Sequence, residues 1–355
     1  MLLSGILPPI TTPFYPDGNV YFKKLEHNVE RYSRTPVSGI VALGTNGEAI
    51  LLSDQERRDV LKTVRDAAAP HKVLIAGTGI ESAIETLRLT EYAAEVGYDV
   101  AMIRTPHFYK RQMESANILA FYRTVADRSP IPVLLYNFPG CTGYDIPVEV
   151  VAALSEHPNI IGIKDSGGDV EKVCRMVEVT RHIKRSATVT ATFDAVTPRM
   201  LKPATQENGN GGQLVSIGGS STTKTQSSTS VVAAPGLKTR QKEVGFQVLV
   251  GAAQVLKPSL EAGAAGAILG MANFAPTACY EIYAAWKEGD TELAALKQEK
   301  IVAASKTVVG DFGVAGTKYA MDLNGYYGGP VRLPLLPLTA DLKTEVERLI
   351  ADIRS

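Results

Sequence analysis

Short, uninterrupted apolar runs recur along the chain, and most of them are separated by segments with helical periodicity. Because these runs are continuously apolar rather than alternating, both faces of each strand are expected to be covered, as in a parallel sheet beneath helices. The runs occupy residues 6–7, 40–43, 73–76, 100–103, 133–136, 160–164, 247–250 and 267–269. Eight strand and helix units in this order predict an α/β fold of the (β/α)8 TIM barrel type.

Helix boundary signals agree with this alternation. Ser53 followed by Glu56 predicts a capping box at the start of a helix, and Gly97 predicts the end of another. We assign residues 1–290 to the barrel and residues 291–355 to a C-terminal helical extension. The last helix of this extension carries one apolar stripe, formed by Leu342, Val346, Leu349 and Ile350.

One spacing departs from this rhythm. The sixth and seventh strands begin 87 residues apart, whereas the earlier strands begin 27 to 34 residues apart. The extra residues fall within 186–243, a Ser/Thr/Gly-rich stretch that is too polar to offset its ordering entropy by burial. We expect a disordered or weakly ordered surface insertion between the sixth helix and the seventh strand. Such a connection lies at the N-terminal end of the barrel strands, opposite the end where barrel active sites lie.

The charge balance excludes one class of protein. The chain has 37 Lys and Arg and 37 Asp and Glu residues, so its formal net charge is zero and no basic face for nucleic acid is indicated. A hydrophobic content of 45% is enough for a large buried core. The longest uncharged stretch, residues 262–280, is interrupted by several glycines and by Pro276, which favours a buried strand and loop over a membrane span.

Cysteine usage and the N-terminus bear on the compartment. Cys141, Cys174 and Cys279 cannot all pair, and they do not follow a metal-ligand spacing. We therefore expect neither a disulfide framework nor a metal site, and a reducing, cytoplasmic environment. No transit peptide is evident at the N-terminus, and a mitochondrial location stays open as the alternative.

Two reactive side chains end neighbouring predicted strands. Lys164 ends the sixth apolar run and Tyr136 ends the fifth, so both are expected at the C-terminal mouth of the barrel. Desolvation among apolar strands lowers the pKa of a lysine and leaves a neutral amine that can attack a ketone, while a phenol can carry protons. The alternatives are structural: Lys164 extends its ammonium to water or pairs with Asp165, and Tyr136 packs its ring in the core.

A glycine-containing turn follows the second strand. Its sequence is Gly44-Thr45-Asn46-Gly47-Glu48. The glycines permit tight backbone conformations, and Thr45 and Asn46 supply hydroxyl and amide donors that suit a carboxylate. An ordinary connection between strand and helix is the alternative.

Four ordered motifs stand at a characteristic spacing: Pro9-x-Thr11-Thr12-Pro13-Phe14, Gly44-Thr45-Asn46-Gly47-Glu48, Tyr136-Asn137-x-Pro139 and Gly162-x-Lys164-Asp165-Ser166. Together they resemble the dihydrodipicolinate synthase and N-acetylneuraminate lyase superfamily of class I pyruvate aldolases. Residues 129–133, 157–160, 164–169 and 325–330 are most similar to 4-hydroxy-2-oxoglutarate aldolase within that superfamily. The resemblance spans nearly the whole chain outside 186–243.

The resemblance implies roles for individual residues. Lys164 forms a Schiff base with the C2 carbonyl of a 2-oxo acid, Tyr136 transfers protons, and Thr45 supports this relay. The residues that the resemblance implies for substrate binding are Asn46, Gly44, Ser166, Gly251 and Ile268. No cofactor is implied, because the iminium supplies the electrophilic stabilisation that a metal ion gives in other aldolases.

Two positions depart from the family pattern. A relay tyrosine in the loop after the fourth strand corresponds to Phe108, which cannot transfer a proton, so Tyr109, His107 or a water molecule has to replace it. The arginine that holds the carboxylate of the aldehyde substrate in dihydrodipicolinate synthases corresponds to Cys141. This second departure disfavours the reaction of lysine biosynthesis.

We therefore expect a carbon-carbon lyase that cleaves a 4-hydroxy-2-oxo acid, such as 4-hydroxy-2-oxoglutarate, to pyruvate and an aldehyde such as glyoxylate. Its expected partner is this small 2-oxo acid, with no nucleic acid and no membrane. The alternatives are an aldolase for 2-keto-3-deoxy sugar acids such as L-threo-3-deoxy-hexulosonate, a dihydrodipicolinate synthase, and a catalytically silent pyruvate-binding barrel. The resemblance also implies a homotetramer assembled as a dimer of dimers.

Overall fold

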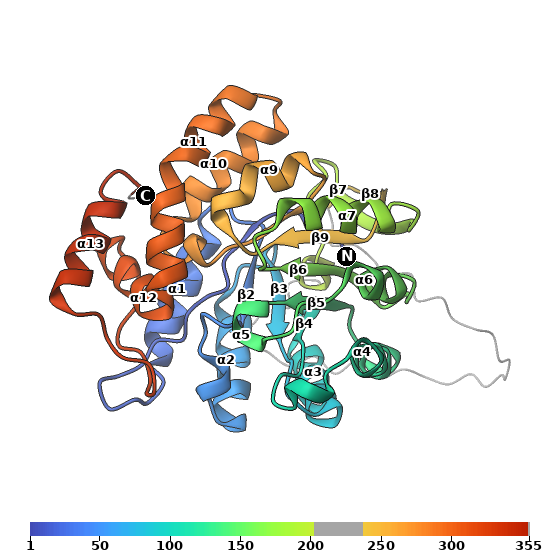
Figure 1. The fold of residues 1–355 in the computed structure, drawn as a ribbon, viewed down its shortest axis with the longest axis horizontal. Helices are drawn as coiled ribbons and strands as arrows, with labels where there is room; N and C mark the ends of the chain where they lie inside the picture. The colour runs from blue at the N-terminus through green and yellow to red at the C-terminus, as the bar shows by residue number, and fades with distance from the viewer. Residues whose placement is uncertain (202–236, 354–355) are drawn as a thin grey trace, which may run out of the picture.

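The computed structural model describes residues 1–201 and 237–353. Within them, eight parallel strands form one sheet that curves into a barrel, as the apolar runs predict (Figure 1). The strands are β1 (Gly5–Leu7), β2 (Gly39–Ala42), β3 (Val73–Gly77), β4 (Val100–Arg104), β5 (Val133–Asn137), β6 (Ile160–Asp165), β9 (Gln247–Val250) and β10 (Gly266–Ile268). Their order is β1-β10-β9-β6-β5-β4-β3-β2. A parallel bridge between Pro9 and Val41, just after β1, joins the two ends of the sheet and closes the barrel.

Helices follow the strands and cover the outside of the barrel (Figure 1). They are α1 (Phe22–Ser33), α2 (Asp54–Ala67), α3 (Ala83–Val96), α4 (Ser115–Arg128), α6 (Val148–Ser155), α7 (Val170–Thr180), α9 (Leu256–Glu261) and α10 (Pro276–Lys287). The predicted capping box is confirmed: the Glu56 N–H donates to Ser53 Oγ at 3.2 Å, and the Ser53 N–H donates to Glu56 Oε2 at 2.8 Å. Gly97 ends α3 at φ 101°, a left-handed conformation that glycine adopts without strain.

Successive residues of each strand face two different apolar layers. Leu7, Met102, Leu134 and Leu249 belong to the layer that fills the inside of the barrel. Ile103 and other residues of the opposite parity pack against the surrounding helices. Covering of both faces explains why the strands are continuously apolar in sequence.

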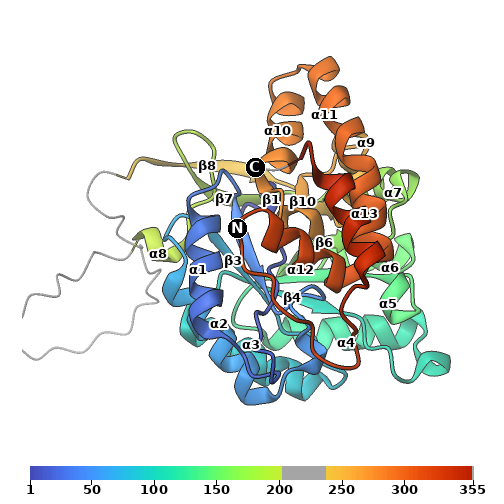
Figure 2. The ribbon, with the colours of Figure 1, turned by 90° about the vertical axis from the view of Figure 1, so that its left-hand side faces the viewer.

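The C-terminal extension consists of helices that pack beside the barrel (Figure 2). It contains α11 (Thr291–Ala304), a π-helix (Ser305–Asp311), α12 (Gly313–Leu323) and α13 (Ala340–Ile350). In α13, Val346 and Ile350 are buried, whereas Leu342 at the start of the predicted stripe is exposed. Among the residues that the structure describes, each helix is too short or too polar to span a lipid bilayer.

The structure orders both ends of the segment that was expected to form a weakly ordered insertion. β7 (Arg185–Thr190) and β8 (Thr239–Val244) form an antiparallel pair, and α8 (Pro198–Leu201) follows β7. The expectation was wrong for these ends, because Ala187 and Val189 alternate with polar residues and pack on Leu2. The rest of the expected insertion, residues 202–236, lies outside the described residues.

This β7–β8 pair lies at the N-terminal end of the barrel, as the connection predicts. Arg185 Nη1 donates to the backbone oxygen of Ile160, the first residue of β6, at 2.8 Å. Thr197 Oγ1 donates to the backbone oxygen of Pro70, shortly before β3, at 2.6 Å. The insertion point is therefore at the opposite end of the strands from Lys164.

Candidate active site

Three neighbouring strands bring an arginine, a tyrosine and a lysine to the same level of the C-terminal mouth. Arg104 of β4 pairs in register with Tyr136 of β5, and Tyr136 pairs with Lys164 of β6. Tyr136 belongs to the inner layer, and Arg104 follows the inward-facing Met102 by two residues. Tyr136 and Lys164, two of the three residues predicted for catalysis, are thus neighbours at the mouth, and Arg104 lies on the other side of Tyr136.

Lys164 is a buried amine. The residue is 3% exposed, and its Nζ lies 4.1 Å from the centroid of the Tyr136 ring. Burial lowers the pKa of Lys164 to about 7, and the nearby Cys141 thiol offsets this only in part. About half of the amine is therefore neutral near pH 7, which is the form that attacks a carbonyl.

The structural alternatives for Lys164 do not hold, because the side chain neither reaches water nor pairs with Asp165. The Asp165 carboxylate instead accepts a hydrogen bond from Asn137 Nδ2 at 2.6 Å and lies 3.9 Å from Lys172 Nζ. Burial raises the pKa of the Asp165 carboxyl, and these partners offset the rise only in part. Asp165 Oδ2 accepts a hydrogen bond from the Gly167 N–H at 3.2 Å, which holds the backbone after β6. The amine of Lys164 has no counter-ion among the described residues.

The phenol of Tyr136 is placed to hold and move a proton. Its hydroxyl lies 3.0 Å from Thr45 Oγ1, across the barrel mouth from β2. Burial raises the pKa of Tyr136, and the hydrogen bond with Thr45 offsets part of that rise. The hydroxyl is therefore protonated at neutral pH and can donate its proton or relay one through Thr45.

The turn of residues 44–48 is held in a strained shape by several contacts. Glu48 has φ 53°, in the left-handed region that is costly for a residue with a side chain. Its carboxylate lies 2.5 Å from Lys318 Nζ and accepts a hydrogen bond from the Arg332 backbone N–H at 2.8 Å. Thr12 Oγ1 donates to the Gly47 backbone oxygen at 2.7 Å. These contacts fix the turn on which Gly44, Thr45 and Asn46 stand at the mouth.

Three other residues predicted for substrate binding lie at neighbouring strand ends. Ser166 follows β6, Gly251 follows β9, and Ile268 ends β10 with its side chain buried in the inner layer. A side chain at Gly251 would overlap the hydroxyl of Ser166, so glycine permits the close approach of these two loops. A side chain at Gly270 would likewise touch Asn46. All eight predicted site residues therefore gather at one end of the barrel.

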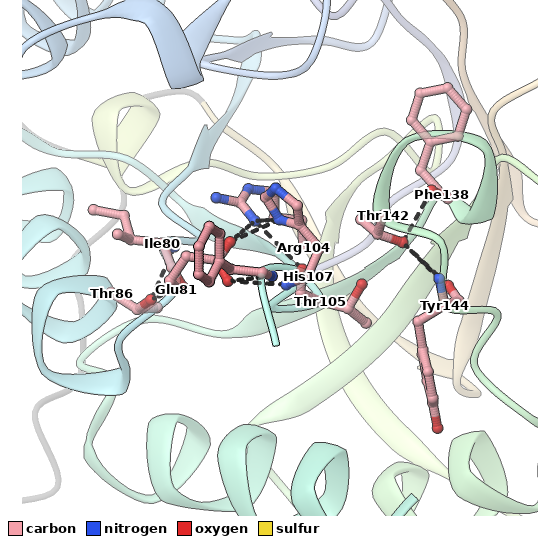
Figure 3. Close-up of polar contacts among 10 residues, drawn as sticks. Ile80, Glu81, Thr86, Arg104, Thr105, His107, Phe138, Thr142 and Tyr144 are labelled. Atoms are coloured by element: carbon pink, nitrogen blue, oxygen red, sulfur yellow. Dashed lines mark hydrogen bonds and ion pairs between the residues drawn. The ribbon is translucent and has the colours of Figure 1, made fainter. Parts of the chain in front are cut away.

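Sequence reasoning missed a cluster on the loops after β3 and β4, which Figure 3 shows in close-up. Arg104 Nη1 donates to Glu81 Oε1 at 2.8 Å and contacts His107 Nδ1 at 2.7 Å. Glu81 Oε2 accepts hydrogen bonds from the backbone N–H groups of His107 and Phe108 at 2.9 and 3.1 Å. Burial alone would raise the pKa of the Glu81 carboxyl, but these hydrogen bonds lower it below its usual value. An arginine at the end of a strand next to Tyr136 was the signal that could have indicated this cluster.

The contacts with Arg104 and Glu81 also fix the position of His107, which precedes Phe108. His107 is tied to Glu81 and Arg104, while Phe108 and Tyr109 are 73% and 65% exposed. Within the described part of a single chain, the hydroxyl in contact with Tyr136 at 3.0 Å is that of Thr45. Neither of the two residues proposed to replace the relay tyrosine therefore occupies that place in a single chain.

The loop after β5 carries Cys141 on the short helix α5 (Pro139–Thr142). Thr142 Oγ1 donates within this loop to the backbone oxygens of Phe138 and Tyr144, each at 3.1 Å (Figure 3). No cation stands at position 141. Among the described residues, no group of three or more His, Cys, Asp or Glu side chains is placed to hold a metal ion.

A cavity of about 280 Å³ lies at the other end of the barrel, where Lys72, Val73 and Asp194 are among its lining residues. None of the eight predicted site residues lines it. It is therefore separate from the mouth.

Comparison with known proteins places this geometry in context. The model of the dihydrodipicolinate synthetase family matches residues 2–206 and 227–353. The chain is 29% identical to the 4-hydroxy-tetrahydrodipicolinate synthase of Methanothrix thermoacetophila over 360 residues, which cover 99% of this chain and 100% of that protein. It is 38% identical to the Xanthomonas campestris protein of the same name over 177 residues, which cover 50% of this chain and 58% of the other.

Solved structures have the same fold over nearly the whole chain. The dihydrodipicolinate synthase of Acinetobacter baumannii, in complex with pyruvate, has a TM-score of 0.76 at 26% identity and covers 99% of both chains. A prophage protein of the dihydrodipicolinic acid synthase family from E. coli K12, also in complex with pyruvate, has a TM-score of 0.77 at 25% identity and covers 99% of both chains.

Proposed function

Because the chain belongs to the dihydrodipicolinate synthetase family, we propose that it is a class I pyruvate-dependent aldolase that cleaves 4-hydroxy-2-oxoglutarate to pyruvate and glyoxylate. One observation carries the proposal. A buried amine with a pKa of about 7 lies 4.1 Å from the ring of a tyrosine whose hydroxyl is hydrogen-bonded to a threonine. These are the nucleophile and the proton carrier that an imine mechanism needs.

The reaction begins at Lys164. Its neutral Nζ attacks the C2 carbonyl carbon, and a proton passes from Nζ to the carbonyl oxygen to give a neutral carbinolamine. Tyr136 donates a proton to the departing hydroxyl, water leaves, and a protonated imine remains between Nζ and C2. The positive imine then withdraws electrons from the neighbouring carbon atoms.

Cleavage follows from that electron demand. Tyr136, now deprotonated and stabilised by Thr45, accepts the proton of the C4 hydroxyl. The C3–C4 bond breaks, its electron pair forms an enamine with C2, and the C4 oxygen becomes the carbonyl of glyoxylate. Tyr136 donates its proton to C3. Addition of water to the imine then releases pyruvate and restores the amine of Lys164 and the phenol of Tyr136.

The remaining predicted residues orient the 2-oxo acid. The turn with Gly44, Thr45 and Asn46 offers donors for the C1 carboxylate. The ends of the last two barrel strands, at Gly251 and Ile268, limit the space around C3. The pyruvate complexes of the two solved structures named above support a pyruvyl site in this family.

The test is reduction with borohydride in the presence of pyruvate, followed by mass mapping of peptides. The expected result is a stable adduct on Lys164, and no adduct in Lys164→Met. An adduct that persists in Lys164→Met would overturn the assignment. Release of glyoxylate from 4-hydroxy-2-oxoglutarate by the wild-type protein tests the substrate separately.

A second candidate is the synthase reaction with an aldehyde bearing an amino acid group, which the names of the relatives favour. Cys141, in the position where the resemblance expects an arginine, opposes it. Incubation with pyruvate and aspartate semialdehyde, followed through the cyclic product, separates the two reactions.

The homotetramer belongs to the proposal too, and the exposed Phe108 and Tyr109 beside the mouth support a second chain there. Sedimentation velocity tests it.

A further inference from the structure

The order of three side chains along the mouth matches the order of groups along the substrate. Lys164, Tyr136 and Arg104 stand at one level on three consecutive strands. In the proposed reaction C2 is bonded to Lys164 and the C4 hydroxyl faces Tyr136. The next group along the substrate, the C5 carboxylate, then lies on the side of Arg104. Strands lie about 4.8 Å apart, so the backbones of Lys164 and Arg104 are about 10 Å apart, a distance that the substrate and an arginine side chain span together.

The guanidinium of Arg104 is anchored by one of its three nitrogen atoms. Nη1 makes the contacts with Glu81 and His107 and lies 3.4 Å from the backbone oxygen of Thr105. Within residues 1–201 and 237–353, no acceptor is hydrogen-bonded to Nε or Nη2. These two nitrogens form the side of the guanidinium fork that binds a carboxylate with two parallel hydrogen bonds. The side chain is 19% exposed, so part of it is accessible to solvent.

The Glu81 carboxylate only partly neutralises the positive charge of Arg104. It also accepts hydrogen bonds from two backbone N–H groups, so its negative charge is shared among three donors. Cys141 supplies no cation on the neighbouring loop after β5, and Lys164 becomes part of the imine. Arg104 is the arginine that the strand register brings to this layer of the mouth.

We propose that Arg104 binds the distal carboxylate of the substrate and makes the enzyme selective for 2-oxo dicarboxylic acids over acids with an uncharged tail. This inference rests on the proposed function and names the residue that recognises its substrate class. Glu81 and His107 are positioning residues that hold the guanidinium beside Tyr136.

The test compares two substrates that differ in one group. 4-Hydroxy-2-oxoglutarate carries a carboxylate at C4, and 4-hydroxy-2-oxopentanoate carries a methyl group there. The measured quantity is the ratio of their kcat/KM values. The kcat/KM for 4-hydroxy-2-oxoglutarate, divided by that for 4-hydroxy-2-oxopentanoate, is expected to fall by about 10- to 100-fold in Arg104→Met. The reason is that the variant loses the hydrogen bonds between the guanidinium and the C5 carboxylate. Arg104→Lys keeps the charge but not the fork, and its ratio is expected to lie between those of the wild type and Arg104→Met.

The matched control is Arg348→Met, which removes an exposed arginine of α13 that pairs with Glu345. Its ratio is expected to equal that of the wild type. An equal loss for both substrates in Arg104→Met would mean that Arg104 only holds the loop, and an unchanged ratio would mean that it does not contact the carboxylate. Either result overturns the inference.

Borohydride trapping of pyruvate separates this failure from failure of the proposed function. Wild type and Arg104→Met are both expected to form the adduct on Lys164. A wild-type protein that forms no adduct would overturn the proposed function and this inference with it. A protein that forms the adduct and cleaves both substrates with an unchanged ratio would overturn only the role of Arg104.

Discussion

The carboxylate of Glu48 lies 2.5 Å from the ammonium of Lys318, and both side chains are 1% exposed. Glu48 ends the turn at the barrel mouth, whereas Lys318 stands on α12 of the C-terminal extension. Lys318 Nζ also donates to the backbone oxygens of Thr12 and Pro330, each at 2.8 Å. The extension is therefore fastened directly to the turn that carries Thr45.

Removal of one member of this pair is expected to destabilise the fold. Lys318→Met leaves the Glu48 carboxylate buried without its partner, which costs about 3–5 kcal/mol. The double variant Glu48→Gln with Lys318→Met is expected to lose less than the sum of the two single losses, because neither charge is then left alone. Urea unfolding measures all three. Lys297→Met, which removes a partly exposed partner of Glu281, is the control, with an expected loss within about 1 kcal/mol. Strictly additive losses at Glu48 and Lys318 would show that the two charges are not coupled.

The pH dependence of imine formation is expected to report Lys164. Burial favours the neutral amine, so the pKa of about 7 lies below the usual value and the reactive form is already present at neutral pH. The initial rate of adduct formation with pyruvate is expected to rise about tenfold between pH 6 and pH 8 and then to level off. Reduction with cyanoborohydride over this range measures it. A rate that keeps rising tenfold per pH unit above pH 8 would indicate an amine with an ordinary pKa.

Loss of one hydroxyl is expected to separate catalysis from packing. Tyr136→Phe keeps the ring beside Lys164 but removes the hydroxyl that contacts Thr45, and kcat is expected to fall about 10²- to 10⁴-fold. Tyr122→Phe is the matched control, because the Tyr122 hydroxyl is also buried but donates to the backbone oxygen of Ile103. That change is expected to lower stability by about 1 kcal/mol and to leave kcat within a factor of about three. Similar kcat values for the two variants would remove Tyr136 from the proton transfer.

Deletion of residues 207–226, which the family match omits, is expected to leave the chemistry intact. The neighbouring described segments contact the N-terminal ends of the strands, away from Lys164. Shortening a connection changes its closure entropy by about 1 kcal/mol or less. The kcat for 4-hydroxy-2-oxoglutarate and the yield of the pyruvate adduct are expected to match those of the full chain. A selective loss of kcat in a deletion variant that folds normally would connect this segment to the site.

The barrel could be predicted because its information is local. Each strand is a short apolar run, and parallel strands align their ends, so the sequence alone predicts that Lys164 and Tyr136 lie close together. The β7–β8 pair was missed because the low-complexity residues beside it masked the alternation of Ala187 and Val189.

Other features depended on contacts between distant segments. Glu81 and Arg104 meet only through the conformations of the loops after β3 and β4, and no periodicity encodes these conformations. Glu48 and Lys318 meet only because α12 packs against the mouth of the barrel. The apolar pattern and the alignment of parallel strands predict at which strand end a residue lies. The partners of charged side chains at the barrel mouth depend instead on how the loops pack.

The contacts of the β7–β8 pair with the floor of the barrel have a practical consequence. In the proposed function the substrate binds at the opposite opening, next to Lys164, so a fluorescent reporter or an affinity handle attached beside these two strands is expected to leave that opening free. The same separation would allow insertions of different length between β7 and β8 to accumulate during evolution without a change in kcat.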